Sequence, residues 1–504
     1  MFACVPGSTI SGIQGLPVIV EVDVAGGLPC LEVVGMADTA LRESRHRVRS
    51  ALRNSGFNIP SRRITVSLAP AAVNKEGSQL DAAIALGILA ASGEIPVNER
   101  LCEYCYLGEL ALDGSLRPVR GALTMALSAR DCGMKGVVVP WQNGSEVSFL
   151  EDIHVLTATC LGDLAKFIRG AGLRSPEKTA SVEILKQRQV DLRDIRGQAA
   201  AKRALEVAAA GGHNILLVGS PGSGKSMLAK AIPSILPLLS FEDSVAVTRI
   251  HGVAGILPEG SGLVRIPPFR APHHTVTSAA LIGGGASPGP GEITLAHRGV
   301  LFLDELPEFS PLVLNALRQP LEEGQAIITR SRGTYVFPCN FMLVAAMNPC
   351  KCGWYTDDYV QCTCRESDRM RYVSRVSGPL LDRIDLHLEV GRVKVHELGE
   401  DAGEESCVVR QKVQAARERQ KERFRGLATA LNAEMTPKEI GERLSFSSNA
   451  RRLALNAYTK MNLSTRGYYR VLRVSATIAD LSSSPRIEEE HVAEALAYRQ
   501  IDPA

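Results

Sequence analysis

The sequence predicts an α/β protein whose central region forms a doubly wound parallel sheet, and three short apolar runs support this. The runs at 215–218, 300–303 and 341–347 have the length and composition of buried strands, and helix-like stretches separate them. Strands that alternate with helices in this way form parallel sheets. Each run is followed by a Gly, Asp or Asn. Because the carboxyl ends of parallel strands line the ligand crevice, we expect the functional site there.

The length of the chain, 504 residues, is enough for about two to four domains. We expect an α/β domain at 1–172, a polar linker at 173–189, the parallel-sheet core at 190–394 and a helical domain at 395–504. Alternating or apolar patterns predict N-terminal strands at 18–24, 64–68, 136–140 and 153–156 and a buried helix at 80–92. Helices are predicted near the C-terminus at 408–424, 466–481 and 488–498.

The composition is that of an ordinary soluble globular protein, with 45% hydrophobic and 22% charged residues. The net charge of +3 does not indicate a class of partner, so any nucleic-acid contact has to come from local clusters. Neither a signal-peptide pattern nor a membrane-spanning apolar run is found. We therefore expect a cytoplasmic protein without a membrane partner, in which most of the 12 cysteines are thiols or metal ligands and not disulfides.

A phosphate-binding loop is predicted between the strand at 215–218 and the helix that follows it. The residues from Gly219 to Ser226 have the spacing G-x-x-x-x-G-K-S in the strand–loop–helix setting that this loop requires. The glycines permit a tight turn that points backbone amides at a phosphate from a helix N-terminus. Lys225 is expected to neutralise the β- and γ-phosphates, and Ser226 to ligate Mg²⁺.

Two further strand ends complete the predicted site for ATP hydrolysis. Asp304 can hold Mg²⁺ through water, and Glu305 beside it can act as the base for the attacking water. Asn348 can hydrogen-bond the γ-phosphate and that water, although an Asn before a Pro is also a common turn residue. The residues expected to bind ATP are Gly219, Ser220, Pro221, Gly222, Ser223, Gly224, Lys225, Ser226 and Asp304.

Two arginines are candidates for sensing the γ-phosphate. Arg383 lies between Asp382 and Asp385, so it is either in a local ion pair or an arginine finger for a neighbouring subunit. Arg466 begins a predicted helix that could close onto the phosphates, and spacing alone does not separate it from Arg470 and Arg473.

A hairpin is predicted at 326–337, where two β-prone runs flank a Ser-Arg-Gly turn. Arg330 and Arg332 at this turn could hold DNA phosphates without reading sequence, or could be ordinary solvated arginines. His273 and His274 lie in another segment that could line a central pore around DNA, and they are not expected to bind metal.

Four cysteines occur within the loop 350–364, as the pairs Cys350/Cys352 and Cys362/Cys364. Four thiolates can close a tetrahedral Zn²⁺ site, and a charged loop with few apolar side chains needs such a crosslink. The C-x-C spacing differs from the more usual C-x₂-C, which leaves free thiols as the alternative. A metal here would be structural and not catalytic.

Together these features resemble an AAA+ ATPase, and longer motifs resemble the magnesium-chelatase-like ComM/YifB family over nearly the whole chain. The motifs are Phe269–His274, Gly283–Gly285, Pro290–Glu292, Ala296–Leu306 and Ser377–His387. The resemblance implies an AAA+ core followed by a helical lid, working as a homo-hexameric motor that promotes branch migration of DNA during uptake and recombination. It also implies the finger role for Arg383 and the second-sensor role for Arg466.

The segments 70–81 and 107–119 resemble the Lon protease domain, and Ser78 would be the nucleophile of such an enzyme. The stretch after Val119 has no lysine where the Lon pattern would supply the base, so we expect a non-proteolytic domain. A protein-remodelling chaperone or ATP-dependent protease is the alternative function. A magnesium-chelatase subunit is less favoured, because a D-x-S-x-S string at 480–484 lies too near the C-terminus to begin a partner domain.

Overall fold

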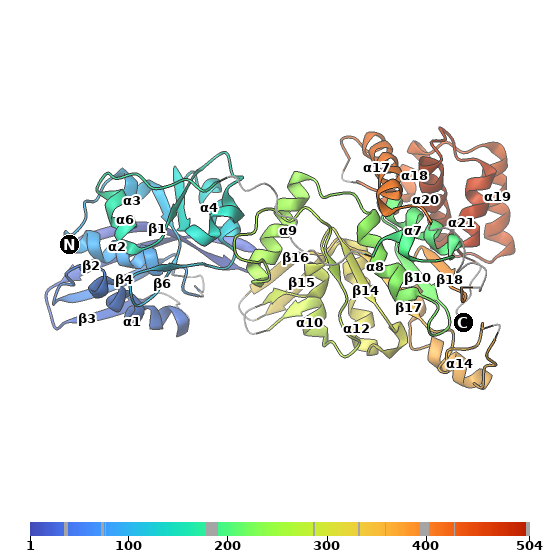
Figure 1. The fold of residues 1–504 in the computed structure, drawn as a ribbon, viewed down its shortest axis with the longest axis horizontal. Helices are drawn as coiled ribbons and strands as arrows, with labels where there is room; N and C mark the ends of the chain where they lie inside the picture. Colours follow the sequence, from blue (N-terminus) through green and yellow to red (C-terminus); the bar gives the residue numbers. More distant parts are fainter. Residues whose placement is uncertain are drawn as a thin grey trace. The chain divides into compact units, whose positions relative to one another are not determined.

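The computed structural model describes residues 1–34, 39–71, 75, 77–177, 190–285, 288–330, 333–357, 359–393, 403–427 and 429–499. The chain divides into two compact units, one made of 1–184 with 240–265 and the other of 185–239 with 266–504 (Figure 1). Within the described ranges, none of the helices has the length and apolar character needed to cross a membrane.

The first unit is built on a mixed sheet with the strand order β1-β2-β4-β3. Its strands are β1 (Phe2–Ser11), β2 (Gln14–Ala25), β3 (Cys30–Val34) and β4 (Arg63–Ala69), and β3 runs parallel to β4 while the other pairs are antiparallel. Helix α2 (Asp81–Ser92) packs on β1 and β2 and is buried from Asp81 to Ala91. This burial explains why the helix carries apolar residues on every face.

A second sheet in this unit is parallel and has the order β5-β8-β9. Its strands are β5 (Tyr104–Tyr106), β8 (Gly136–Pro140) and β9 (His154–Ala158), and the unit also contains the pair β6 (Glu109–Leu110) and β7 (Leu116–Arg117) with helices α1 (Thr39–Asn54), α3 (Glu99–Glu103), α4 (Ala122–Asp131), α5 (Gly144–Val147) and α6 (Leu161–Ile168). The N-terminal strands and the helix predicted from the sequence are all confirmed.

Helix α9 (Phe241–Ala254) packs against α4 and so belongs to the first unit, although the sequence groups it with the parallel-sheet core. The first unit is therefore made of two separate stretches of chain. Nothing in the local pattern of 240–265 indicates this, because the helix has no long apolar face and its partner lies more than a hundred residues away.

The second unit contains the predicted parallel sheet, which is confirmed. Among the described residues it has five strands in the order β11-β14-β17-β10-β18, and every neighbouring pair is parallel. The strands are β10 (Ile215–Val218), β11 (Phe269–Arg270), β14 (Val300–Leu303), β17 (Met342–Met347) and β18 (Leu386–Glu389). Strand β10 lies between β17 and β18, so the loop that follows it lies beside the end of β17, where such folds bind ligands.

Helices of the C-terminal region continue the core of this unit. In Figure 1 the orange and red helices gather beside α7 (Ala199–Gly211), and α17 also packs on α8 (Lys225–Ile235). These helices are α17 (Ser406–Arg423), α18 (Pro437–Arg443), α19 (Ser448–Lys460), α20 (Thr465–Leu481) and α21 (Glu489–Ala497), and they confirm the three predicted from the sequence. One apolar cluster runs from the sheet through α7 and α8 into this region.

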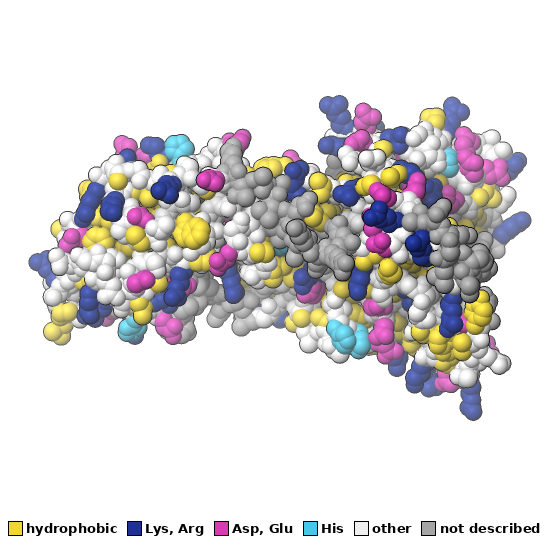
Figure 2. Space-filling view, viewed as in Figure 1, with side chains coloured by type: hydrophobic (Ala, Val, Ile, Leu, Met, Phe, Trp, Pro, Cys, Tyr) yellow, Lys and Arg dark blue, Asp and Glu magenta, His cyan; other side chains and the backbone are white. Residues whose placement is uncertain are grey.

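The other helices and hairpins of the second unit lie in the segments that connect the strands of the sheet. They are helices α10 (Ser278–Ile282), α11 (Glu292–Leu295), α12 (Pro311–Ala316), α13 (Arg318–Glu323), α14 (Glu366–Val373) and α15 (Gly378–Leu381), and the hairpins β12 (Gly283–Gly284) with β13 (Gly289–Pro290) and β15 (Gln325–Arg330) with β16 (Gly333–Pro338). Figure 2 shows basic and acidic side chains interspersed over the visible face, in keeping with the small net charge.

Candidate nucleotide site

The loop from Gly219 to Ser226 connects β10 to α8 and has the backbone that a phosphate cradle needs. Helix α8 begins at Lys225, with Gly224 as the residue that precedes it. Gly222 and Gly224 have φ values of +79° and +92°, in the left-handed region that favours glycine. Open space surrounds both positions, so backbone conformation is the reason that the sequence has glycine there.

Lys225 is held inside this loop by three oxygen atoms. Its Nζ donates to the carbonyl oxygens of Gly219 and Ser220, at 2.8 and 2.9 Å, and to Oδ1 of Asn348 at 3.2 Å. Burial lowers the pKa of the Lys225 ammonium, and the carboxylate of Asp304 opposes that shift. The contact with Asn348 joins the end of β17 to the loop after β10.

Ser226 and Asp304 contact each other although they follow β10 and β14, which are separated by β17 in the sheet. The Ser226 hydroxyl donates to Oδ2 of Asp304 over 2.7 Å, although 78 residues separate them in the chain. A hydroxyl and a carboxylate at a phosphate-binding loop are oxygen ligands of the kind that Mg²⁺ takes. The structure thus brings together Lys225, Ser226, Asp304 and Asn348, all four predicted from sequence.

Glu305 has an unusual backbone conformation beside this cluster. Its φ of +52° lies in the left-handed region, and its backbone amide donates to Oδ1 of Asp304 at 3.0 Å. Residues other than glycine that are held in this region are strained, and they concentrate at functional sites. The Glu305 side chain is 58% exposed, so water can reach its carboxylate.

His274 contacts the carboxylate of Glu305, which the sequence did not predict. Its Nδ1 lies 3.5 Å from Oε2 of Glu305, and its ring packs against that of His273 with centroids 4.0 Å apart. The contact arises because β11, which precedes these histidines, pairs with β14, which precedes Glu305. The contact between His274 and Glu305 could have been predicted only if the order of the strands had been known.

Gln198 is a second contact that sequence reasoning missed. Its Nε2 donates to the carbonyl oxygen of Gly391 over 2.6 Å and, over a longer 3.4 Å, to that of Ser223 in the phosphate loop. Gln198 has a φ of +57°, which is rare for a residue with a side chain. It links the segment before α7 to the loop and to the chain after β18.

Arg383 does not pair with either neighbouring aspartate. Its guanidinium donates to the carbonyl oxygen of Pro379 at 2.5 Å and forms an ion pair with Glu322, and its side chain is 11% exposed. The local pair considered from the sequence is thus replaced by a pair with a residue of α13. Arg466 lies in the first turn of α20 and is exposed.

Asp385 instead belongs to a buried network that connects the sheet to α20. It pairs with Nε of Arg470 at 3.2 Å and with Nδ1 of His213 at 3.3 Å, and Nε2 of His213 lies 2.8 Å from the Thr477 hydroxyl. Burial opposes ionisation of Asp385, but the hydrogen bond from His213 and the charges of His213 and Arg470 outweigh it and lower the pKa to about 2. Arg470 therefore has a buried structural partner, whereas Arg466 is exposed.

The predicted hairpin at 326–337 is confirmed as β15 and β16, with Arg330 paired to Gly333 next to the turn. Arg330 is exposed, whereas Arg332 lies outside the described residues. The guanidinium of Arg330 lies 3.3 Å from the point where a side chain on Gly284 would begin, so the β12–β13 hairpin lies against it. A bidentate ion pair between Arg270 and Glu292, at 2.7 and 2.8 Å, connects two of the sequence motifs.

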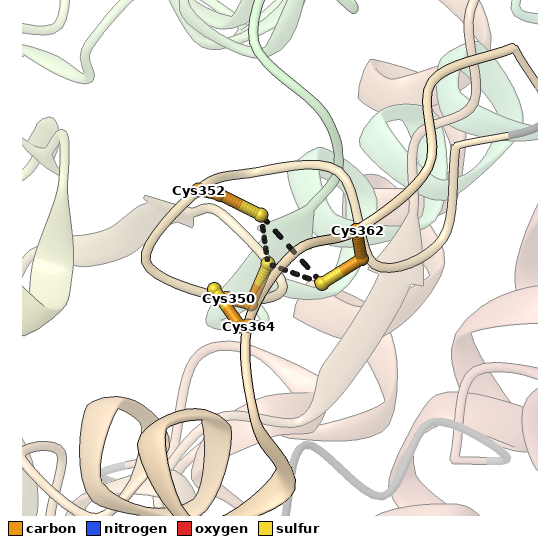
Figure 3. A group of neighbouring side chains, drawn as sticks. All are labelled: Cys350, Cys352, Cys362 and Cys364. Atoms are coloured by element: carbon orange, nitrogen blue, oxygen red, sulfur yellow. Dashed lines mark hydrogen bonds between the residues drawn. The ribbon is translucent and has the colours of Figure 1, made fainter.

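The four cysteines of the 350–364 loop converge on one point (Figure 3). Their sulfur atoms all lie within 4.8 Å of one another, and Cys350 is fully buried. Partial burial opposes ionisation of Cys352, yet hydrogen bonds from the amides of Trp354 and Thr363 and from neighbouring thiols lower its pKa to about 6. The arrangement has the donor set of a tetrahedral thiolate metal site.

Models of protein families match three consecutive parts of the chain. The model for magnesium chelatase subunit ChlI matches residues 191–398, the model for subunit ChlI of Mg-chelatase matches 20–143, and that for the ChlI C-terminal region matches 403–499.

Two of the relatives compared match along almost their whole length, and a third matches over a short part. The chain is 43% identical to the uncharacterised protein YifB of Escherichia coli over 497 residues, covering 97% of this chain and 96% of YifB. It is 42% identical to the competence protein ComM of Haemophilus influenzae over 499 residues, covering 97% and 95%. The 67 kDa magnesium-chelatase subunit of Chlorobaculum parvum matches over 170 residues at 30% identity, covering 31% of this chain and 23% of that subunit. The chain therefore belongs to the ComM/YifB family of magnesium-chelatase-like proteins.

Proposed function

We propose that this protein hydrolyses ATP with Mg²⁺ and uses the energy to move along DNA as a hexameric ring in the cytoplasm. The observation that carries the proposal is the meeting of Lys225, Ser226, Asp304 and Asn348 at the carboxyl end of one parallel sheet. Membership of a magnesium-chelatase-like AAA+ family supports ATP and Mg²⁺ as the ligands.

Each side chain at the site has a chemical task in hydrolysis. The ammonium of Lys225 would contact the β- and γ-phosphates. The phosphate oxygens would replace the loop carbonyls to which this ammonium donates hydrogen bonds in the structure. Ser226 and Asp304 hold Mg²⁺, which when bound neutralises charge on the phosphate oxygens. Asn348 orients the attacking water, and Glu305 accepts its proton after its carboxylate leaves His274.

The ring is proposed because, among the described residues joined by the hydrogen bonds of the Lys225, Ser226, Asp304 and Asn348 cluster, Lys225 is the one cation. Arg383 would supply a positive charge for the γ-phosphate to the adjoining subunit as a finger, exchanging its ion pair with Glu322 for the phosphate. Arg466, exposed at the start of α20, would act as the second sensor within its own subunit.

DNA is proposed as the substrate from the hairpin and from the relatives. Arg330, with Arg332 two residues further along the sequence, would line the central pore and contact phosphates without reading bases. The name of the Haemophilus relative, a competence protein, supports a role in taking up and recombining DNA, with branch migration as the activity.

The first unit is proposed to be a Lon-like scaffold without peptidase activity. The hydroxyl of Ser78 donates to the carboxylate of Glu109, which is an acceptor and leaves the serine without an activating lysine at that contact.

The test is the ATPase rate of the purified protein alone and with branched DNA, single-stranded DNA or unfolded protein, together with its mass in solution. We expect a hexamer in the presence of ATP and DNA, and a rate that branched or single-stranded DNA raises. A rate raised only by unfolded protein would favour a protein-remodelling machine. A monomer that ignores DNA would contradict the proposal.

A further inference from the structure

We propose that Cys350, Cys352, Cys362 and Cys364 bind one Zn²⁺ ion, and that this ion holds in place the loop that supports the phosphate cradle and Asn348. The metal site is argued from the cysteines alone. Its link to nucleotide binding rests on the function proposed above.

The sulfur positions fit a single tetrahedral ion. Zn–S bonds of about 2.3 Å place the four sulfurs of a tetrahedral site about 3.8 Å apart. The separations from Cys350 to Cys352 and Cys362 are 3.3 and 3.7 Å, and Cys352 and Cys362 are 3.6 Å apart. Sulfurs in a disulfide are about 2.05 Å apart, so the geometry is that of a metal site and not of two crosslinks.

The backbone around Cys352 is shaped to support a thiolate. Amides of Trp354 and Thr363 donate toward its sulfur, as the amides near zinc-bound cysteines do. Gly353 has a φ of +88°, which lets the chain turn directly after Cys352. Each C-x-C pair is thus placed by local backbone geometry, and the metal would join the two pairs across the loop.

The same turn is packed against the phosphate loop. A side chain on Gly353 would begin 2.6 Å from Cδ of Pro221 and 3.8 Å from Cγ of Asn348, so Gly353 touches both halves of the nucleotide site. Cys350 lies two residues after Asn348 in the chain. The backbone amide of Asn348 also donates a hydrogen bond to the phenol oxygen of Tyr372 in α14, and burial raises the pKa of that phenol to about 12.

A second contact ties the loop to the same site. Asp357 accepts hydrogen bonds from the amides of Tyr359 and Val360, at 3.0 and 2.9 Å, and pairs with Arg392 at 2.7 Å. It also receives a hydrogen bond from Ser220 of the phosphate loop. The ion would act together with these contacts to hold Asp357 and Gly353 in position.

Metal content of the purified full-length protein tests the first half of the proposal. We expect one zinc per chain by inductively coupled plasma mass spectrometry, and loss of that zinc in the double variant Cys350→Ser/Cys362→Ser. The control Cys407→Ser, at an exposed cysteine of the same unit, should retain it. Protein without bound zinc, iron in its place, or a double variant that retains full zinc would overturn the metal site.

A spectroscopic test uses the unaltered chain and so avoids misfolding of a variant. Wild-type protein in which zinc has been exchanged for Co²⁺ should show the intense visible bands of cobalt held by four thiolates. Weak bands typical of octahedral oxygen ligation would overturn the assignment.

The second half is tested by the affinity for a fluorescent ATP analogue before and after zinc is removed from the wild type with a thiol reagent and chelator. We expect the Kd to rise about tenfold, since supporting residues of this kind have effects of that size, and to recover when zinc is restored under reducing conditions. An unchanged Kd would overturn the link to the nucleotide site. A protein with one zinc that never binds ATP would instead overturn the proposed function and leave the metal site standing.

Discussion

The second unit contains two clusters of polar residues, and the two clusters have different roles. One is the group Lys225, Ser226, Asp304 and Asn348 at the ends of the strands, and the other is the buried group His213, Asp385, Arg470 and Thr477. Both join residues that are far apart in the sequence. The two clusters differ in the partners that their charged side chains contact.

In the first cluster the contacts are ones that a ligand can replace. Lys225 is held by backbone carbonyls and by a neutral amide, so a phosphate would be a stronger partner than any it now has. In the second cluster the partners are complementary, because Asp385 faces His213 and Arg470. The ion pairs of Asp385 therefore stabilise the fold, whereas Lys225 can exchange its neutral acceptors for a phosphate.

Lys225→Ala should therefore remove function and leave stability nearly intact. We expect ATP binding to fall by at least about a thousandfold, because the strong charge-assisted contacts to the phosphates are lost. The midpoint of thermal unfolding should change little, since the buried ammonium costs desolvation. Calorimetric titration with ATP and a melting curve measure both, and Lys230→Ala, at an exposed position of the same helix, is the control.

Glu305→Gln should separate binding from chemistry. The variant retains the size of the side chain and loses the base, so hydrolysis should slow by about 10²–10⁴-fold while ATP affinity is preserved. Single-turnover hydrolysis and equilibrium binding measure the two quantities. Normal turnover would show that another group accepts the proton.

Asp385→Asn should give the converse result. Removing one partner of a buried ion pair leaves the others uncompensated and typically costs about 3–5 kcal/mol of unfolding free energy. ATP affinity of the folded protein should be unchanged. Denaturant unfolding checks this, and loss of ATP binding at full stability would break the distinction between the two clusters.

The same variant should alter acid stability in a defined direction. The folded-state pKa of Asp385, about 2, lies below its ordinary value of 3.8, so its contribution is present above 3.8 and is lost as the pH falls toward 2. Between these values the wild type should lose more unfolding free energy than Asp385→Asn does. Equal slopes would mean that the carboxylate is not stabilised by its partners.

The residues of the first cluster could be predicted from the sequence, whereas the contacts of the second cluster could not. The phosphate loop and the strand ends are local patterns, and parallel-sheet geometry places all their carboxyl ends along one edge of the sheet. His274 against Glu305, Gln198 across the loop, and Glu322 as the partner of Arg383 depend on strand order and tertiary packing. No spacing rule contains that information. The place of helix α9 in the first unit could not be predicted for the same reason.

Mixing subunits tests whether Arg383 belongs with the replaceable contacts. Arg383→Ala and Lys225→Ala subunits are each expected to be inactive alone. In mixed rings an intact site can form between one subunit's Lys225 and its neighbour's Arg383, so part of the ATPase activity should return. Failure to recover activity at every mixing ratio would assign Arg383 to a structural pair with Glu322.

The smallest effect is expected at the hairpin, where Arg330 is exposed and its partners would be phosphates shared among many contacts. Arg330→Ala should weaken DNA binding several-fold at low salt and reduce the slope of log affinity against log salt by about 1, equally for all DNA sequences. Lys438→Ala removes an equivalent exposed charge on α18 and should leave both quantities unchanged. Fluorescence anisotropy with single-stranded DNA at several salt concentrations measures them. An unchanged slope in Arg330→Ala would place this arginine among solvated surface charges, and DNA would then have to be held elsewhere in the ring.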